Sequence, residues 1–418
     1  MSDFTRLVPK TENAPAKVKD TGVVGLVKDG AAAYNAKSGE LLLLPAGEEK
    51  RSDIAGKLLN ALFEQAGFQH VDCGSDAAIF SLAERYVREW QDTATAFAEC
   101  RGRNIRLLGW SKEVTGAGDR MENAMRALLS ALPEERPAKE TFAFVEAVAP
   151  DVTRSSFLLS PSGESPLRAE NGFVCPACGK MFLPDTPYAF RAPQPGESEQ
   201  EQALEDIETP GANTIVDLCK QLGIDIEYTL KAMLYVAFDA AGASHPVAAF
   251  VRGDFSVSMN KLSAWLKNEH GLTGLRTAEK AELFEMIGEV AGYCGPVNLP
   301  ENVIVVCDES VRGAKNTVVG ANRPGYHRKG CCWGRDFTAP LADIVQIAEG
   351  IPCICGKADL VASALRVCGQ LSYGDAGTPS GDQHKVLSYR DREGNHEYPI
   401  ELDGILFTES ILLATQTC

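Results

Sequence analysis

The sequence has no long apolar run and no excess of positive charge. No stretch approaches the ~20 consecutive apolar residues that a membrane-spanning helix needs, and residues 1–20 contain no apolar segment typical of a secretory signal. We therefore expect a cytoplasmic protein with no membrane partner. The formal net charge of −16 argues against broad binding of DNA or RNA, because such binding relies on Lys and Arg to neutralise phosphates. A local nucleic-acid site is still compatible with this charge.

Cysteine, by contrast, is plentiful. The chain has 13 cysteines, an odd number scattered without the tight spacing of a disulfide framework, which favours reduced thiols. Two close pairs are candidate metal ligands, Cys175 with Cys178 and Cys353 with Cys355. Four thiolates suit a structural zinc ion. Reduced cysteines beside a turn are the competing interpretation, and the short C-x-C spacing of the second pair favours it.

Strand and helix signals alternate over residues 209–340. Short apolar runs that end in turn or charged residues predict strands buried on both faces. Segments with helical period that end at a glycine predict helices. Together they predict a compact α/β unit. The strands are expected at Ala232–Phe238, Val247–Val251 and Val303–Cys307, and the helices at Ile215–Leu222 and Ala278–Ile287.

The same region contains a series of short motifs. They are Thr209-Pro210 with Thr214-Ile215, Thr229-x-Lys231, Val251-Arg252-Gly253-Asp254, Gly295-Pro296-Val297-Asn298, Gly320-Ala321-Asn322, His327 and Arg335-Asp336. In this order they resemble the editing insertion of bacterial-type prolyl-tRNA synthetases and the free-standing YbaK-like deacylases. The resemblance implies a mixed α/β editing domain over residues 209–348 that hydrolyses mischarged tRNA.

The resemblance also implies roles for single residues. Lys231 interrupts an apolar strand, where a buried lysine is costly unless it is paired or functional; an edge-strand lysine facing solvent is the alternative. Lys231 and His327 are predicted to position the substrate for catalysis, and Gly295 to offer a backbone amide to the oxyanion. Alone, His327 would read as a surface histidine and Gly295 as part of a turn. The predicted substrate-binding residues are Pro296, Asn298, Asn322, Asp336 and Arg252.

No strong general base is evident among these motifs. The resemblance accordingly implies hydrolysis assisted by the terminal ribose hydroxyl, with no cofactor required, and alanyl-tRNA(Pro) as the substrate. A basic cluster could contact the tRNA acceptor end, although in isolation it would read as a solvated charged loop. We define this basic cluster as Arg323, His327, Arg328, Lys329 and Arg335.

The flanking regions resemble a reduced class II prolyl-tRNA synthetase domain, which implies an antiparallel sheet. Its ligase motifs are damaged. Lys112 stands where the family has a carboxylate for the ammonium of proline, and a cation there would repel it. No segment resembles motif 2, whose arginine stabilises the reacting phosphate. In the motif 3 region, Glu409 replaces the arginine that binds ATP.

These features predict an editing domain inserted into a degenerate synthetase scaffold. The expected layout is a loose lead-in at 1–20, synthetase-like parts at 21–186 and 349–418, a linker at 187–208 and the editing domain at 209–348, with a short helix at 341–350. The cysteine pairs flank the insertion and should meet at its neck. The expected function is deacylation in trans, with the acceptor end of tRNA(Pro) and prolyl-tRNA synthetase as partners. A non-catalytic binding paralogue and a residual proline-tRNA ligase are the alternatives.

Overall fold

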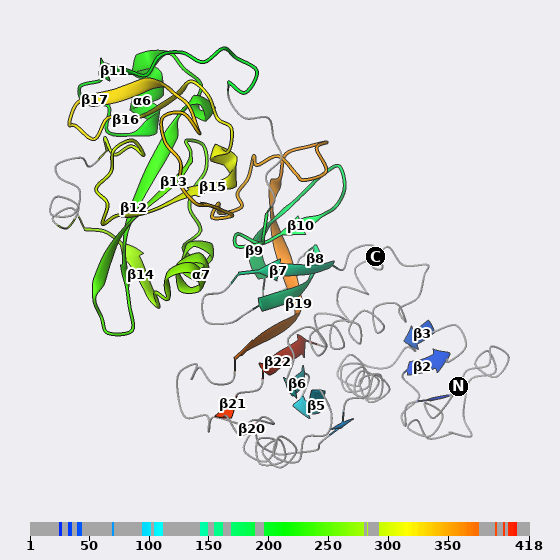
Figure 1. The fold of residues 1–418 in the computed structure, drawn as a ribbon. Helices are drawn as coiled ribbons and strands as arrows, with labels where there is room; N and C mark the ends of the chain where they lie inside the picture. The colour runs from blue at the N-terminus through cyan, green and yellow to red at the C-terminus, as the bar shows by residue number, and fades with distance from the viewer. Residues whose placement is uncertain are drawn as a thin grey trace.

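The computed structural model describes residues 169–188, 196–279 and 292–375 without interruption, together with Glu282 and separate strands in both flanking regions. In this part of the chain the fold is mixed α/β, with mostly sheets and few helices (Figure 1). None of the described helices is long and apolar enough to cross a membrane. Most of the helix predicted at Ala278–Ile287 lies outside the described residues, as do Lys112 and Glu409.

A five-stranded sheet forms the centre of residues 209–348. We call these residues the editing region, after the domain that the sequence predicts there. β12 and β13 pair antiparallel, whereas β13 with β15 and β15 with β18 pair parallel. The three strands predicted from apolar runs are confirmed as β12, β13 and β15. In sheet order the strands are β14 (Gly274–Thr277), β12 (Leu230–Phe238), β13 (Ser244–Arg252), β15 (Ile304–Asp308) and β18 (Leu341–Ala342).

Strand β13 is buried on both faces, and each face belongs to a different apolar core. Side chains alternate across a strand, so Val247 and Val251 point to one side and Ala248 and Phe250 to the other. The first side packs against helix α7 (Met259–His270) and the region that joins the sheet to the rest of the chain. The second side packs against Val303, Cys307 and Val319.

A second sheet lies beside the second core. It has the order β11-β17-β16 and is antiparallel. β11 (Glu205–Glu208) belongs to the segment expected to be a linker, which is in fact hydrogen-bonded to β17 (Tyr326–Cys331); β16 (Thr317–Gly320) completes the sheet. The predicted helix α6 (Ile215–Leu222) is confirmed: the Thr214 hydroxyl caps its first turn, and Gly223 ends it at φ 65°.

The flanking regions supply a nine-stranded, mainly antiparallel sheet, as the class II resemblance implied (Figure 1). In it β9 and β19 pair antiparallel with Val174 opposite Val361, at the place where the chain enters and leaves the editing region. The strands are β4 (Gln69–His70), β5 (Ala94–Arg101), β6 (Asn104–Ser111), β7 (Ala143–Ala147), β8 (Arg154–Pro161), β9 (Ala169–Val174), β10 (Met181–Phe182), β19 (Val361–Asp375) and β22 (Ile400–Phe407).

Short elements complete the described structure. They are the three-stranded sheet β1 (Gly25–Leu26), β2 (Ala32–Asn35) and β3 (Glu40–Leu43), the hairpin β20 (Tyr389–Arg390) and β21 (His396–Glu397), and the 3-10 turns Ile226–Tyr228 and Glu309–Val311.

The helix predicted at 341–350 is wrong. Leu341 pairs with Cys307 as part of β18. The next amides, those of Ile344 and Val345, donate to the buried carboxylate of Asp308 at 3.0 and 3.1 Å. The next donors, the N–H groups of Gln346 and Ile347, bond to the carbonyls of Ser256 and Pro184. The segment therefore bonds to other parts of the chain rather than to itself, and it forms no helix.

Candidate functional site

Two glycines let a loop and a strand approach each other closely. A Cβ atom at Gly295 would lie 1.9 Å from the carbonyl oxygen of Gly320, and a Cβ atom at Gly320 would lie 2.2 Å from the carbonyl oxygen of Tyr293. Neither position can hold a larger residue unless the backbone moves. The Gly-Pro-Val-Asn motif is thus pressed against the end of β16. We call residues 293–297 the glycine loop.

Asn322 fixes the glycine loop in place. Its side-chain amide donates to the carbonyls of Gly295 at 3.1 Å and Val297 at 2.8 Å, and its Oδ1 accepts from the N–H of Gly295 at 2.8 Å. Its backbone N–H donates to the Tyr293 carbonyl at 2.9 Å. Asn322 adopts φ 55°, a left-handed conformation that asparagine tolerates better than most residues. The side-chain amide of Asn322 is therefore used in hydrogen bonds to the glycine loop, and the N–H of Gly295 is used in one of them.

His327 lies beside this loop in strand β17, opposite Gly320 in the β16–β17 pairing. It is 4 % exposed. Its Nδ1 lies 2.6 Å from the hydroxyl of Thr209, which is itself fully buried. The ring of Tyr293 packs on the imidazole with 5.3 Å between centroids. The histidine is thus held from both sides, and Nε2 is the ring nitrogen that Thr209 does not contact.

Burial sets the charge of His327. Removing the imidazole from water disfavours its cationic form and lowers its pKa from 6.5 to about 4. The ring is therefore neutral at physiological pH. A neutral imidazole can donate or accept a hydrogen bond but cannot offer a positive charge to a phosphate.

Lys231 approaches the same region from strand β12. An isolated parallel bridge joins Thr229 to Val318, and two residues further along both strands lie Lys231 and Gly320. The lysine is half-buried. Partial burial lowers its pKa, and the nearby Asp254 carboxylate opposes that shift. Asn322, His327 and the glycine loop thus meet at Gly320. Lys231 lies opposite Val251 in the β12–β13 pairing, so its side chain points to the first-core face of the sheet.

Other predicted site residues make different contacts. Arg252 is 6 % exposed and forms a two-point ion pair with Asp254, at 2.6 and 2.7 Å. Asp336 pairs with Arg335 at 2.7 Å and accepts from the Cys332 N–H at 2.8 Å, so it closes a turn. In the glycine loop motif, Pro296 is buried, whereas Asn298 is exposed with φ 63°.

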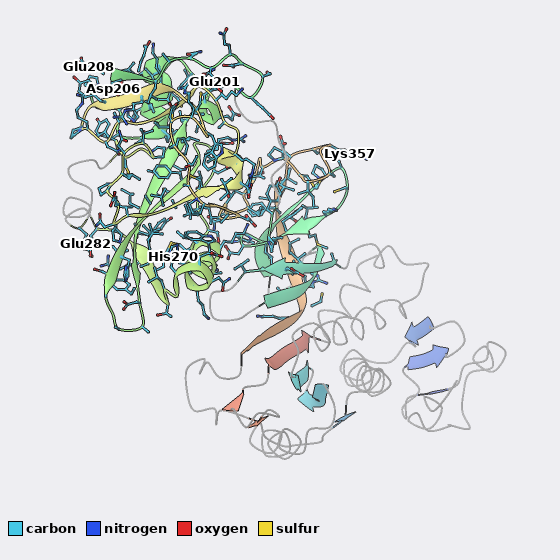
Figure 2. The ribbon with its side chains drawn as sticks, viewed as in Figure 1. Glu201, Asp206, Glu208, His270, Glu282 and Lys357 are labelled. Carbon is cyan, nitrogen blue, oxygen red and sulfur yellow. The ribbon has the colours of Figure 1, made fainter. Side chains whose placement is uncertain are left out.

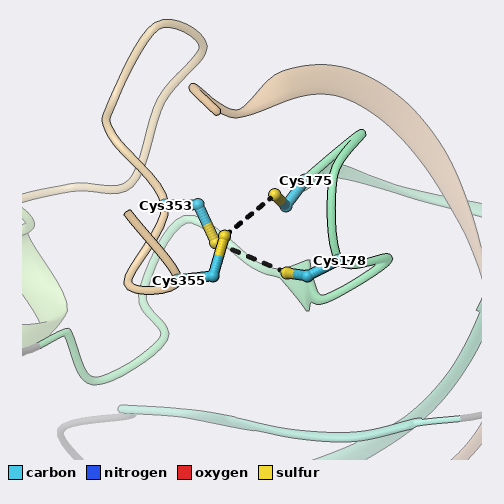
Figure 3. A group of neighbouring side chains, drawn as sticks. All are labelled: Cys175, Cys178, Cys353 and Cys355. Carbon is cyan, nitrogen blue, oxygen red and sulfur yellow. Dashed lines mark hydrogen bonds between the residues drawn. The ribbon is translucent and has the colours of Figure 1, made fainter. Parts of the chain in front are cut away.

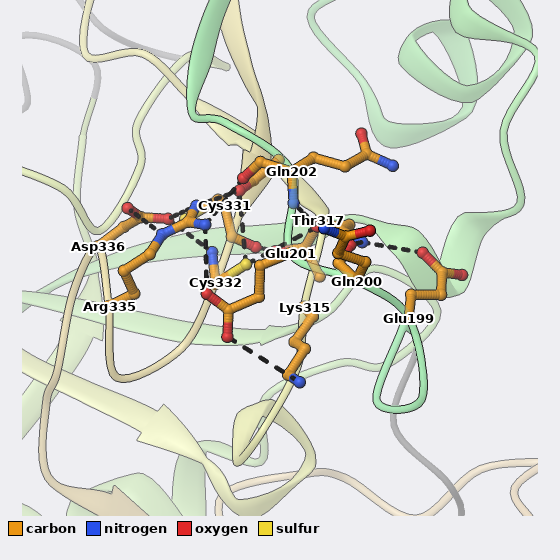
Figure 4. A network of polar contacts seen from close by, with 12 residues as sticks. Glu199, Gln200, Glu201, Gln202, Lys315, Thr317, Cys331, Cys332, Arg335 and Asp336 are labelled. Atoms are coloured by element: carbon orange, nitrogen blue, oxygen red, sulfur yellow. Dashed lines mark hydrogen bonds and ion pairs between the residues drawn. The ribbon is translucent and has the colours of Figure 1, made fainter.

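An acidic segment faces the basic cluster. We define the acidic segment as residues 199–208, which contain Glu199, Glu201, Glu205, Asp206 and Glu208. Asn316 holds its first part by donating to Glu199 at 2.9 Å and accepting from the Gln202 N–H at 2.8 Å. Figure 4 labels Glu199 and Gln202 within the surrounding polar network. The four arginine and lysine side chains of the basic cluster are ion-paired with it: Arg323 and Arg328 with Asp206, Lys329 with Glu205, and Arg335 with Glu201.

The acidic segment lies at the periphery of the editing region, where Glu201, Asp206 and Glu208 are labelled in Figure 2. Sequence reasoning treated residues 187–208 as a separate linker and therefore missed this neutralisation. It also gave no role to Thr209 or Tyr293. Thr209 was present in the motif series, but its contact with His327 joins positions far apart in the chain. No signal in the sequence singled out Tyr293.

The cysteine pairs meet at the neck, away from the site around Gly320. Cys175, Cys353 and Cys355 pack with the first core, on the α7 side of the sheet, whereas Val297 and Val319 beside the site belong to the second core. The two clusters therefore lie on opposite faces of β13.

Comparison with known proteins identifies the central region. Residues 209–337 match the family model described as the aminoacyl-tRNA editing domain. A proline–tRNA ligase of Aquifex aeolicus is 35 % identical over 209 residues, covering 49 % of this chain and 34 % of the relative. One of Streptococcus mutans is 40 % identical over 147 residues, covering 35 % of this chain and 22 % of the relative.

A solved structure described as a candidate trans-editing enzyme for prolyl-tRNA synthetase is 18 % identical, with a TM-score of 0.27 over 35 % of this chain and 87 % of that one. The chain spans about a third of the length of the curated relative from Aquifex. The match over residues 209–337 coincides with the glycine loop, Asn322, His327 and Lys231. Residues 209–337 are an aminoacyl-tRNA editing domain.

Proposed function

We propose that this chain is a deacylase that acts in trans on mischarged tRNA, with alanyl-tRNA(Pro) as its substrate. The observation that carries the proposal is the packing of His327, Asn322 and the glycine loop around Gly320 inside a region that matches an editing domain. Editing requires a positioned ester and water, stabilisation of the developing oxyanion and a pocket that selects the amino acid.

Lys231, which the family resemblance implicates, His327 and the glycine loop would have distinct roles. The Lys231 ammonium would hold the terminal phosphate or orient the ester. His327, neutral because burial lowers its pKa to about 4, would position the substrate through hydrogen bonding and is a weak base at neutral pH. The free ribose hydroxyl of the tRNA would therefore take the proton of the attacking water and pass its own proton to the leaving ribose oxygen, so that the ester breaks into the free amino acid and a ribose diol.

The glycine loop would shape the pocket. Because the Gly295 N–H already donates to Asn322 Oδ1 at 2.8 Å, Gly295 would act mainly by holding the loop against β16, in contrast to the oxyanion role expected from the sequence. A small pocket built on an immobile loop would admit alanine and exclude proline.

Deacylation kinetics test this proposal. Alanine release from alanyl-tRNA(Pro) would be measured with prolyl-tRNA(Pro) and alanyl-tRNA(Ala) as controls, and rapid loss is expected only from the first. Lys231→Ala should slow release by about 100-fold, the scale of losing one charged or polar group that stabilises a transition state. Lys220→Ala, at an exposed position of α6, is the matched control and should behave as wild type.

Two outcomes would overturn the proposal. If wild type hydrolyses none of the three substrates, the chain is a binding paralogue. If Lys231→Ala is as fast as wild type, the site is elsewhere.

The curated relatives are ligases, so proline-dependent ATP–pyrophosphate exchange should be measured in parallel. No exchange is expected, because Lys112, Glu409 and the missing motif 2 remove the charges that activation needs. Exchange above background would establish the ligase alternative.

A further inference from the structure

Four cysteine sulfurs converge where the editing region joins the nine-stranded sheet. The Sγ atoms of Cys175, Cys178, Cys353 and Cys355 all lie within 4.8 Å of one another (Figure 3). Cys175 and Cys355 are 3.6 Å apart, and Cys178 and Cys353 are 3.8 Å apart. The pairs come from opposite ends of the inserted region, so the cluster is a long-range product of the fold.

These spacings fit a metal ion better than a disulfide. Sulfurs at ~2.3 Å from a tetrahedral zinc ion lie about 3.8 Å from each other, which matches both measured separations. A disulfide would need ~2.05 Å between two sulfurs, much less than either separation. An all-sulfur tetrahedron is also the ligand set typical of zinc or iron.

Both loops have the backbone shape of a metal-binding turn. In the first, the Gly179 N–H donates to the Cys175 carbonyl at 2.9 Å, with Gly179 at φ 70°. In the second, the Gly356 N–H donates to the Cys353 carbonyl at 2.8 Å, with Gly356 at φ 68°. Each loop therefore turns back tightly after its first cysteine.

The neck around the cluster is already well connected. Asp185 accepts from the Ser258 hydroxyl at 2.6 Å and from the Asn260 amide at 2.7 Å, at the start of α7. Asp343 accepts from the Tyr188 N–H at 2.7 Å and pairs with the buried Lys261 at 2.9 Å. The thiols lie at the side of this neck that borders β9 and β19.

We propose that Cys175, Cys178, Cys353 and Cys355 bind one structural zinc ion that clamps the editing domain to the nine-stranded sheet. Because the protein supplies all four ligands, the ion has no open position for catalysis. Its effect would be to fix the segment that follows β9 to the segment that precedes β19, and so to hold the neck closed. The clamp can be tested without tRNA, so its failure and that of the proposed deacylase are distinguishable.

Metal analysis of the full chain is the direct test. The protein would be purified without chelator from zinc-supplemented medium, and its zinc and iron would be measured by plasma mass spectrometry. One zinc per chain is expected. Cys178→Ser changes an exposed ligand and should reduce the zinc content at least tenfold, whereas Cys178→His should retain zinc because imidazole is also a zinc ligand. Cys219→Ser, outside the cluster, should leave it at one.

Cobalt provides a second readout, which is made first on the wild-type chain. The reduced, zinc-free chain should bind one Co²⁺ and show the intense visible and charge-transfer absorption of a tetrahedral tetrathiolate. Zinc should abolish that absorption and raise the melting temperature, and Cys178→Ser should show neither response. The clamp is overturned by iron in place of zinc, by a disulfide among these cysteines in the untreated protein, or by cobalt spectra without thiolate bands.

Discussion

His327 carries a pH dependence that can be measured apart from catalysis. Its pKa is about 4 in the folded protein and 6.5 when exposed. As pH falls below 6.5, His327 therefore binds a proton in the unfolded chain but not in the folded chain. The stability associated with a neutral His327 is therefore present above pH 6.5 and is lost as pH falls toward 4. The loss between pH 7 and pH 5 should be roughly 1–2 kcal/mol.

Urea unfolding at both pH values would test this linkage. His327→Gln should lose less stability than wild type between pH 7 and pH 5. His270→Gln, at the exposed end of α7, should lose as much as wild type. An unchanged pH dependence in His327→Gln would show that the imidazole is not the group that titrates.

Asn322 differs from its sequence-based role in an informative way. The motif predicted a substrate-binding side chain, but the side chain makes three hydrogen bonds to the glycine loop. Asn322→Ala should slow deacylation, because a loop that moves no longer holds the pocket, and should lower the free energy of unfolding by about 2 kcal/mol. Asn268→Ala, at an exposed position of α7, is the control. Equal activity of the two variants would contradict a positioning role for Asn322.

The glycine loop can contact β16 closely because Gly295 and Gly320 have no side chains. Gly295→Ala should lower the free energy of unfolding by about 1–3 kcal/mol, the usual penalty for overpacking, because its Cβ would meet the Gly320 carbonyl at 1.9 Å. Gly274→Ala in β14 is the matched control, since its Cβ would sit at an ordinary 3.4 Å from Phe238. Equal thermal midpoints for both variants would mean that the loop and strand can separate without loss.

At the scale of helices and strands, the sequence predicted the elements that local patterns encode. Strands β12, β13 and β15 and helix α6 follow from apolar runs and from Gly223. The acidic segment escaped prediction because β11 has one apolar residue, Ile207, and its register matches Asp206 with Arg328, a partner distant in the chain. The helix expected at 341–350 failed for a similar reason. Asp308, on another strand, satisfies the amides that a helix would have used.

At the scale of the whole molecule, the net charge bears on the proposed binding of tRNA. The net charge is −16, and the basic cluster is paired with the acidic segment. Asp206→Asn would release Arg328 and Arg323 from their shared carboxylate. The variant should bind tRNA about fivefold more tightly at low salt, with a steeper salt dependence, because more cations become available to phosphate. Binding would be measured by fluorescence anisotropy over a salt series.

Glu301→Gln, an exposed acidic position outside the acidic segment, separates the local effect from the change in net charge. A similar gain in both variants would mean that only total charge matters. No gain in Asp206→Asn would mean that the basic cluster faces away from bound tRNA.

Because Val174 pairs with Val361, residues 175–360 are an insertion between two strands that would otherwise form a hairpin. Neighbouring antiparallel strands can be joined by a turn of two residues. A chain in which such a turn replaces residues 175–360 would keep every residue pair between β9 and β19. Conversely, the excised segment begins and ends at the same place, so it could be grafted between two adjacent strands of an unrelated sheet. The architecture is thus that of an inserted domain whose two ends are adjacent, with the four cysteines at the junction.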